Sequence, residues 1–205
     1  MIKNYDDLSP VAIDCLREIG NIGSSYAAGS LSSMLEKPVL MRVPDVSVLE
    51  YNKVIDHMGG PEKIITGILV RLSGDISGMI MFLLEESFQN VVLSTFLHTE
   101  NVNMMTLDET QASVILEMGN IMSGSYINAL SMLTSMHIER SVPSMTVDML
   151  GAIMSVPITE FASVGDKVLF IDDGFIIDGV DIKSNIILIP EMASLNTLMR
   201  KLGVI

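Results

Sequence analysis

The segment REIGNIGS at residues 17–24 recurs as LEMGNIMS at residues 116–123, after a shift of 99 residues. Each copy places glutamate, glycine and asparagine inside a run that otherwise reads as a long apolar helix. Glycine costs about 1 kcal/mol in a helix interior, and asparagine is a mediocre helix former. Because both helices carry these unfavourable residues at the same places, we infer that the residues serve a purpose in each.

The repeat extends along the rest of the chain. Residues 72–97 resemble residues 177–202, where the offset has grown to about 105–107, so several residues are inserted in the second half. A period near 100 residues is too long for a solenoid unit. We therefore expect two pseudo-symmetric halves, at about 8–98 and 106–203, packed as a single domain over residues 1–205.

A long helix is expected to open each half. Ser9 can cap the first helix with Pro10 in its first turn, and Thr106 with Glu109 matches a capping box for the second. Pro38 is expected to end the first helix.

Short β-type runs and a closing helix follow each long helix. The expected strands are residues 43–49, 63–74, 78–84, 142–149, 167–177 and 185–190, and the expected closing helices are 86–97 and 191–202. Residues 54–60 and 149–154 are ambiguous, with a short helix as one reading. The predicted fold class is α+β, with a central sheet of about six strands covered by helices.

The composition limits the classes of partner. Twelve Lys and Arg stand against 25 Asp and Glu, and the formal charge of −13 disfavours nucleic acid. The single cysteine, Cys15, cannot form an internal disulfide, and the N-terminus lacks the apolar core of a signal peptide, so we expect a cytoplasmic protein. The longest apolar region, residues 64–84, is interrupted by Arg71, Gly74 and Asp75, which predicts a β-hairpin and no membrane insertion.

The repeated motif places three polar residues on one face of each long helix, at spacings i, i+4 and i+7. They are Asp14, Glu18 and Asn21 in the first helix, and Ser113, Glu117 and Asn120 in the second. A solvated face would explain one such set, but not its repetition.

Glycine precedes the asparagine in both copies, as Gly20 and Gly119. A residue without a side chain allows a close approach, either by the backbone of a partner protein or by a neighbouring element of the same fold. The sequence leaves both readings open.

Glutamate and asparagine together favour one kind of chemistry. An amide is not a general base, but it can hold a water molecule through donated and accepted hydrogen bonds. Positioning of this kind suffices when the substrate is already activated and a metal ion offsets its charge, as in phosphoryl transfer. An acyl phosphate beside a partner's own Mg²⁺ is such a substrate, and the glutamate could pair with a lysine of that partner.

The full pattern, D/S-x3-E-x2-N-x22-P, ends at Pro44 in the first half and at Pro143 in the second. This repeated pattern closely resembles the CheC chemotaxis phosphatases, of the CheC/CheX/FliY group, over nearly the whole chain. The resemblance implies an enzyme that hydrolyses the phosphoaspartate of the CheY response regulator. It also implies a second partner, the receptor deamidase CheD. No cofactor is expected in this chain, because the Mg²⁺ should belong to the regulator.

The resemblance also assigns roles to the repeated residues. Asn21 and Asn120 would orient the attacking water, while Glu18 and Glu117 would hold the regulator's lysine. Asp14 and Ser113 would support the site through a hydrogen bond that orients it. Pro44 and Pro143 would have an architectural role.

Three alternatives compete with this interpretation. The chain could be an adaptor that binds CheD and phosphorylated CheY with little or no turnover, although both Glu and Asn pairs are intact. It could be a flagellar switch component, which we expect to need extra segments at both ends. A metal-dependent hydrolase is disfavoured because His57, His98 and His137 are scattered, and Cys15 is expected to be a small buried apolar residue.

Overall fold

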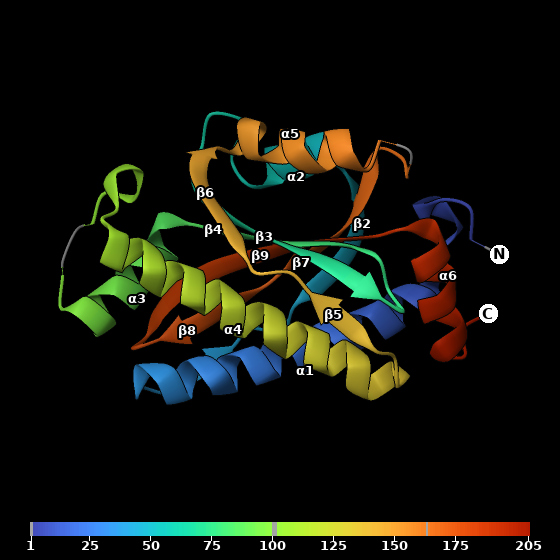
Figure 1. Ribbon diagram of the computed structural model, residues 1–205, viewed down its shortest axis with the longest axis horizontal. Coiled ribbons are helices and arrows are strands. Elements are labelled where there is room, and N and C mark those ends of the chain that lie inside the picture. The colour runs from blue at the N-terminus through green and yellow to red at the C-terminus, as the bar shows by residue number, and fades with distance from the viewer. Residues whose placement is uncertain (1, 100–101, 163) are drawn as a thin grey trace.

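The computed structural model describes residues 2–99, 102–162 and 164–205. Figure 1 shows its elements, which follow the same order in both halves except that the second half has one more strand. The first half contains α1 (Pro10–Leu35), β1 (Val39–Met41), β2 (Asp45–Glu50), α2 (Tyr51–His57), β3 (Ile64–Gly74), β4 (Gly78–Leu84) and α3 (Glu86–Leu97). The second half contains α4 (Glu109–Thr134), β5 (Ile138–Arg140), β6 (Ser144–Met149), α5 (Leu150–Glu160), β7 (Lys167–Asp172), β8 (Gly174–Ile177), β9 (Val180–Pro190) and α6 (Met192–Lys201). A short 3-10 turn precedes each long helix, at Tyr5–Asp7 and Met104–Thr106.

The strands of both halves join one antiparallel sheet. β4 and β9 pair along its middle, where Met81 lies opposite its repeat counterpart Ile187. β3 flanks β4, while β7 and β8 flank β9. β5 and β6 pair with β3 on one side, and β1 and β2 pair with β8 and β7 on the other. An approximate twofold axis therefore passes through the β4–β9 pair.

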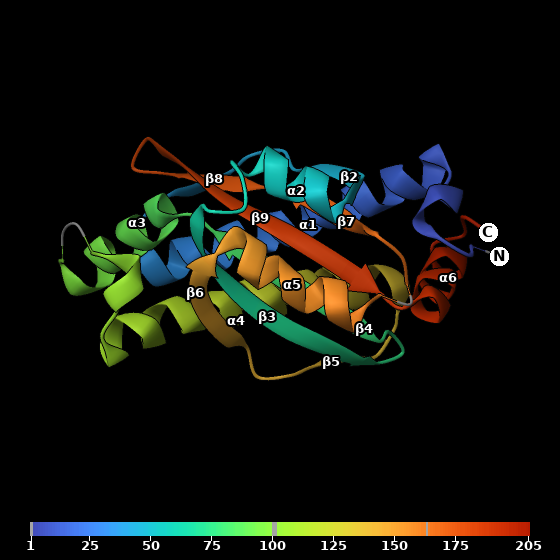
Figure 2. The same ribbon diagram turned by 90° about the horizontal axis from the view of Figure 1, so that it is seen from above.

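Helices cover both faces of this sheet. α1 and α4 lie side by side on one face, and α2 and α5 lie on the other (Figure 1 and Figure 2). The α1 and α4 face holds the larger apolar core, which includes Leu16, Ile68 and Met118. A smaller core, which includes Val54 and Ile153, lies under α2 and α5. The predicted α+β class is confirmed.

The prediction of six strands is too low, since the described residues form nine. The short strands β1 and β5 were not predicted, because three residues are too few for a periodic pattern. Residues 167–177 divide at Asp173 into β7 and β8, although both pair with β9 in one register. The ambiguous segments form α2 and α5, and the inserted residues lengthen α5, which has 11 residues against seven in α2.

The start of α1 is as predicted, because the Ser9 side chain accepts a hydrogen bond from the Ala12 amide at 3.2 Å. The start of α4 differs. Asp108, and not Thr106, caps this helix, and it forms a capping box with Gln111 through bonds of 2.8 and 3.0 Å. Thr106 instead ends the preceding 3-10 turn, and Glu109 is the first helical residue.

The predicted role of Pro38 is also wrong. α1 ends at Leu35, and Glu36 follows in the left-handed conformation with φ of 52°. α4 ends at the same repeat position, with Ser135 at φ of 54°. Residue 137, the counterpart of Pro38, is a histidine. The left-handed cap therefore accounts for both ends.

The two motif glycines point into the protein. A Cβ built on Gly119 would lie 2.6 Å from Cδ1 and 2.7 Å from Cγ2 of the buried Ile68 on β3. A Cβ on Gly20 would meet Val46 Cγ2 at 3.4 Å, which is an ordinary contact. Packing against the sheet, and not access for a partner, therefore explains Gly119.

This difference predicts unequal effects of alanine at the two glycines. Gly119→Ala should destabilise the protein by about 1–2 kcal/mol, because overpacking exceeds the gain in helix propensity. Gly20→Ala should be neutral or stabilising by up to about 1 kcal/mol. Urea unfolding of the two variants measures this directly, with each as the control for the other. Equal effects would contradict the packing argument.

Candidate functional site

The first Glu and Asn pair lies on the outward face of α1. Glu18 is exposed and Asn21 is half-buried. The Asn21 side-chain amide donates a hydrogen bond to Glu18 Oε2 at 3.4 Å. The spacing of three residues allows this contact, because residues i and i+3 are neighbours on a helix surface.

The second pair repeats this geometry on α4. Glu117 is exposed, Asn120 is half-buried, and the Asn120 amide donates to Glu117 Oε2 at 3.3 Å. α1 and α4 run in opposite directions, and each pair lies in the N-terminal half of its helix, so the two pairs lie toward opposite ends of the helix pair (Figure 1). The structure thus places two similar polar sites on one side of the molecule.

The residues one turn before each glutamate make different contacts in the two halves. Asp14 accepts a hydrogen bond from Arg17 at 2.6 Å, and Arg17 also lies 3.8 Å from Asp45. Ser113 donates to the backbone oxygen of Glu109 at 2.7 Å. The bonds described for Asp14 and Ser113 do not reach the Glu and Asn pairs, and the orienting role of these positions stays a prediction.

A buried proline adjoins each pair. Pro44 directly precedes β2 and Pro143 directly precedes β6, as the architectural interpretation requires. The valines before them, Val43 and Val142, are 80% and 85% exposed. The Val-Pro dipeptide, repeated at residues 43–44 and 142–143, is the signal in the sequence for these exposed apolar side chains.

The second pair borders a hollow of about 440 Å³ between α4 and the segment that follows β5. Its wall includes Glu117, Asn120, Val142 and Arg140. Arg140 was not predicted as a site residue. Its Nη1 donates to the side-chain oxygen of Asn120 and, at 3.2 Å, to the Asn120 backbone oxygen.

Known proteins share both the motif segments and the fold. The sequence profile of the CheC-like family matches residues 11–48 and 111–147, which carry the two copies of the motif. The chain therefore resembles the CheC-like family in the two segments that carry the motif. It is 27% identical to the CheY-P phosphatase CheC of Bacillus subtilis (strain 168) over 206 residues, which cover 97% of each protein.

Two further comparisons match proteins named FliY. The flagellar motor switch phosphatase FliY of Bacillus subtilis (strain 168) is 29% identical over 143 residues, which are 69% of this chain and 37% of FliY. The crystal structure of Thermotoga maritima FliY superposes with a TM-score of 0.76 at 23% identity, covering 96% of this chain and 98% of that one. The second comparison shows a shared fold.

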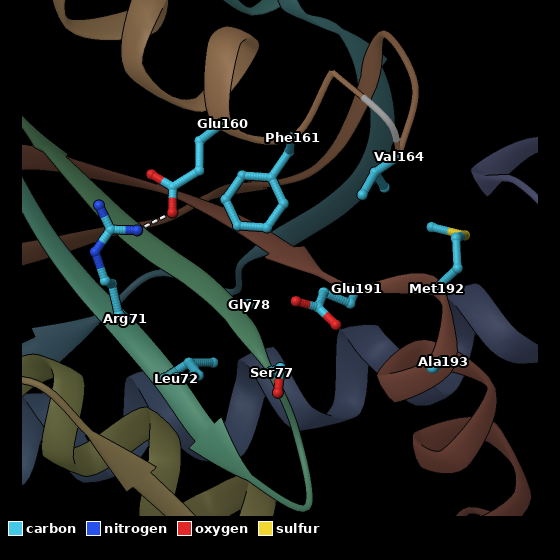
Figure 3. A pocket seen from close by; sticks show the side chains of 10 residues that line it. All are labelled: Arg71, Leu72, Ser77, Gly78, Glu160, Phe161, Val164, Glu191, Met192 and Ala193. Atoms are coloured by element: carbon cyan, nitrogen blue, oxygen red, sulfur yellow. Dashed lines mark hydrogen bonds and ion pairs between the residues drawn. The ribbon is translucent and has the colours of Figure 1, made fainter.

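The protein has a larger hollow away from both Glu and Asn pairs. Figure 3 shows this space of about 540 Å³ between β3, the end of α5 and the start of α6. Arg71 and Glu160 form an ion pair in its wall, so their charges offset each other. Residues that act on a group carried by another protein must face outward. For this reason we favour the Glu and Asn pairs on α1 and α4 over the larger hollow as the functional site.

The three histidines lie on the surface of the protein. His57 Nε2 lies 3.2 Å from Asp172, and His137 Nε2 lies 3.2 Å from Glu139. Within residues 2–99, 102–162 and 164–205, no three His, Cys, Asp or Glu side chains form a group that could hold a metal ion. Cys15 is half-buried. No helix in the described ranges has the length and apolarity needed to cross a membrane.

A buried polar network ties the two motif helices to the sheet. Asp173 Oδ2 accepts hydrogen bonds from Ser24 of α1 at 2.6 Å and from Tyr126 of α4 at 2.5 Å. Its other oxygen accepts from the Gly174 amide at 2.8 Å. Burial raises the pKa of the Asp173 carboxyl, although these hydrogen bonds act in the opposite direction. This network could not be predicted from the sequence, because Asp173 lies inside an apolar run and its partners are distant in sequence.

Proposed function

We propose that this chain is a cytoplasmic phosphatase that removes the phosphoryl group from the aspartate of a CheY response regulator. The observation that supports it most is the Glu and Asn pair, present on two helices with the same internal hydrogen bond. A relative of similar length is named a CheY-P phosphatase, and a second relative is named a flagellar motor switch phosphatase.

In this proposal, Asn21 and Asn120 hold the water that attacks phosphorus. The side-chain amide can accept from the water and donate to it, which fixes the direction of the oxygen lone pair. A bond forms between the water oxygen and phosphorus, and the bond between phosphorus and the aspartate oxygen breaks. The regulator's own Mg²⁺ offsets the negative charge, so positioning supplies most of what this chain adds.

Glu18 and Glu117 serve a different purpose, which is to dock the regulator. Each carboxylate is exposed and can form a charge-assisted bond with the regulator's active-site lysine. The bond between the amide and the glutamate would then weaken, which frees the amide for water. The exposed Val43 and Val142 lie beside the two sites, where an apolar contact with the regulator would exclude solvent.

The test is the rate of phosphate loss from a phosphorylated CheY regulator in the presence of Mg²⁺, with and without this protein. We expect the protein to accelerate phosphate loss, with each molecule acting on many regulator molecules in turn. Binding of the regulator without faster phosphate loss would overturn the proposed phosphatase activity. It would favour the alternative that the protein is an adaptor that binds CheY and CheD. CheD is proposed as a partner on the family resemblance alone, and adding CheD to that reaction tests whether it alters the rate.

A further inference from the structure

Arg140 makes the second site chemically different from the first. It is the last residue of β5, and its Nη1 donates to both oxygens of Asn120 and to Ser123 Oγ, the latter at 3.2 Å. The repeat position in the first half is Met41, at the end of β1. The first site therefore has the apolar side chain of Met41 at the position where the second site has the guanidinium group of Arg140.

Among the residues that the structure describes, no carboxylate forms an ion pair with Arg140. Its three described acceptors are neutral amide, carbonyl and hydroxyl oxygens. The arginines beside the first site are paired, because Arg17 contacts Asp14 and Asp45, and Arg42 lies 3.4 Å from Asp181. Among the described contacts, only the second site thus has a cation that bonds its asparagine without a carboxylate partner.

We propose that Arg140 is a positioning residue of the second site that holds the Asn120 amide in one orientation and presents positive charge to an incoming phosphoryl group. This inference rests on the proposed function. In the free protein the Asn120 oxygen accepts from Arg140 while its nitrogen donates to Glu117, and the bond from Arg140 still orients the amide once Glu117 pairs with the regulator's lysine. A carbonyl oxygen has two lone pairs, and one stays available for water.

Two physical effects make this arrangement productive. A preoriented amide loses less rotational freedom when the water binds, so more of the binding energy is expressed in the transition state. The guanidinium also lines the 440 Å³ hollow beside Asn120, where its charge would stabilise the phosphoryl oxygens of a docked regulator. Asn21, by contrast, has only Glu18 as a described side-chain partner.

The test uses variants in which only one of the two sites is active. Asn21→Ala leaves the second site, and adding Arg140→Met gives that site the residue that the first half carries. We expect kcat to fall about tenfold, with KM and binding of a beryllofluoride-activated regulator changed by less than about twofold. Arg140→Lys should restore part of kcat, because it returns the charge without the planar guanidinium. Arg200→Met, on the exposed surface of α6, is the matched control.

The outcomes separate this inference from the proposed function. An unchanged or increased kcat in the Arg140→Met variant would overturn the positioning role, and so would an increase in KM alone. Loss of folding is monitored by circular dichroism, and the lysine variant supplies the comparison if methionine destabilises β5. An inactive wild-type protein would overturn the proposed function itself, and this inference with it.

Discussion

The double variant Asn21→Ala, Asn120→Ala is expected to lower the catalysed rate of regulator dephosphorylation about a hundredfold, to near the regulator's own rate. Such a loss corresponds to about 2.7 kcal/mol of transition-state stabilisation, which is within the reach of one well-placed amide. Alanine removes both the donor and the acceptor that direct the water. It leaves Glu18 and Glu117 in place, so the affinity for the regulator should change little.

Single-turnover phosphate release with excess protein measures the chemical step, and titration with a beryllofluoride-activated regulator measures binding. Asn128→Ala is the matched control, because Asn128 is an exposed asparagine on α4 outside the motif. The two single variants then divide the activity between the sites. A double variant that keeps most of the wild-type rate would exclude the water-positioning role.

The long helices and the repeated motif could be predicted from sequence because their signals are local. The spacing of Glu18 and Asn21 fixes their common face once the segment is helical, and the Val-Pro dipeptides mark the strands that follow. The cap of α4 was missed for a related reason. Thr106 with Glu109, and Asp108 with Gln111, both match the start of a helix, and only the structure shows which pair forms the bonds.

Side-chain contacts between distant elements could not be predicted. Gly20 and Gly119 have the same place in the motif, yet only Gly119 meets a buried branched side chain at overlapping distance. Arg140 differs from its repeat counterpart Met41, so a search for repeated residues passes over it. Its contact with Asn120 depends on how β5 lies beside α4, which no local pattern specifies.

Replacing Asp173 by alanine is expected to lower the free energy of unfolding by about 3 kcal/mol. The carboxylate joins α1, α4 and the sheet, and its removal leaves the Gly174 amide and one of two buried hydroxyls without an acceptor. Ser24 and Tyr126 can still bond each other, since their oxygens lie 2.5 Å apart, which limits the loss. Asp172→Ala is the control, because the neighbouring Asp172 pairs with the exposed His57 and should contribute at most about 1 kcal/mol.

The stability of the wild-type protein should also depend on pH through this group. The pKa of Asp173 is raised by burial in the folded state, so the folded protein binds more protons than the unfolded chain above the ordinary aspartate pKa. Stability therefore falls as the pH rises through that window. The isosteric Asp173→Asn variant has no titrating group there, so the stability of wild type relative to this variant should decrease as the pH rises above the ordinary aspartate pKa of about 4. Urea unfolding of both proteins across this range measures the difference, in which the contributions of other carboxylates cancel, and a difference that is constant or increases with pH would contradict the raised pKa.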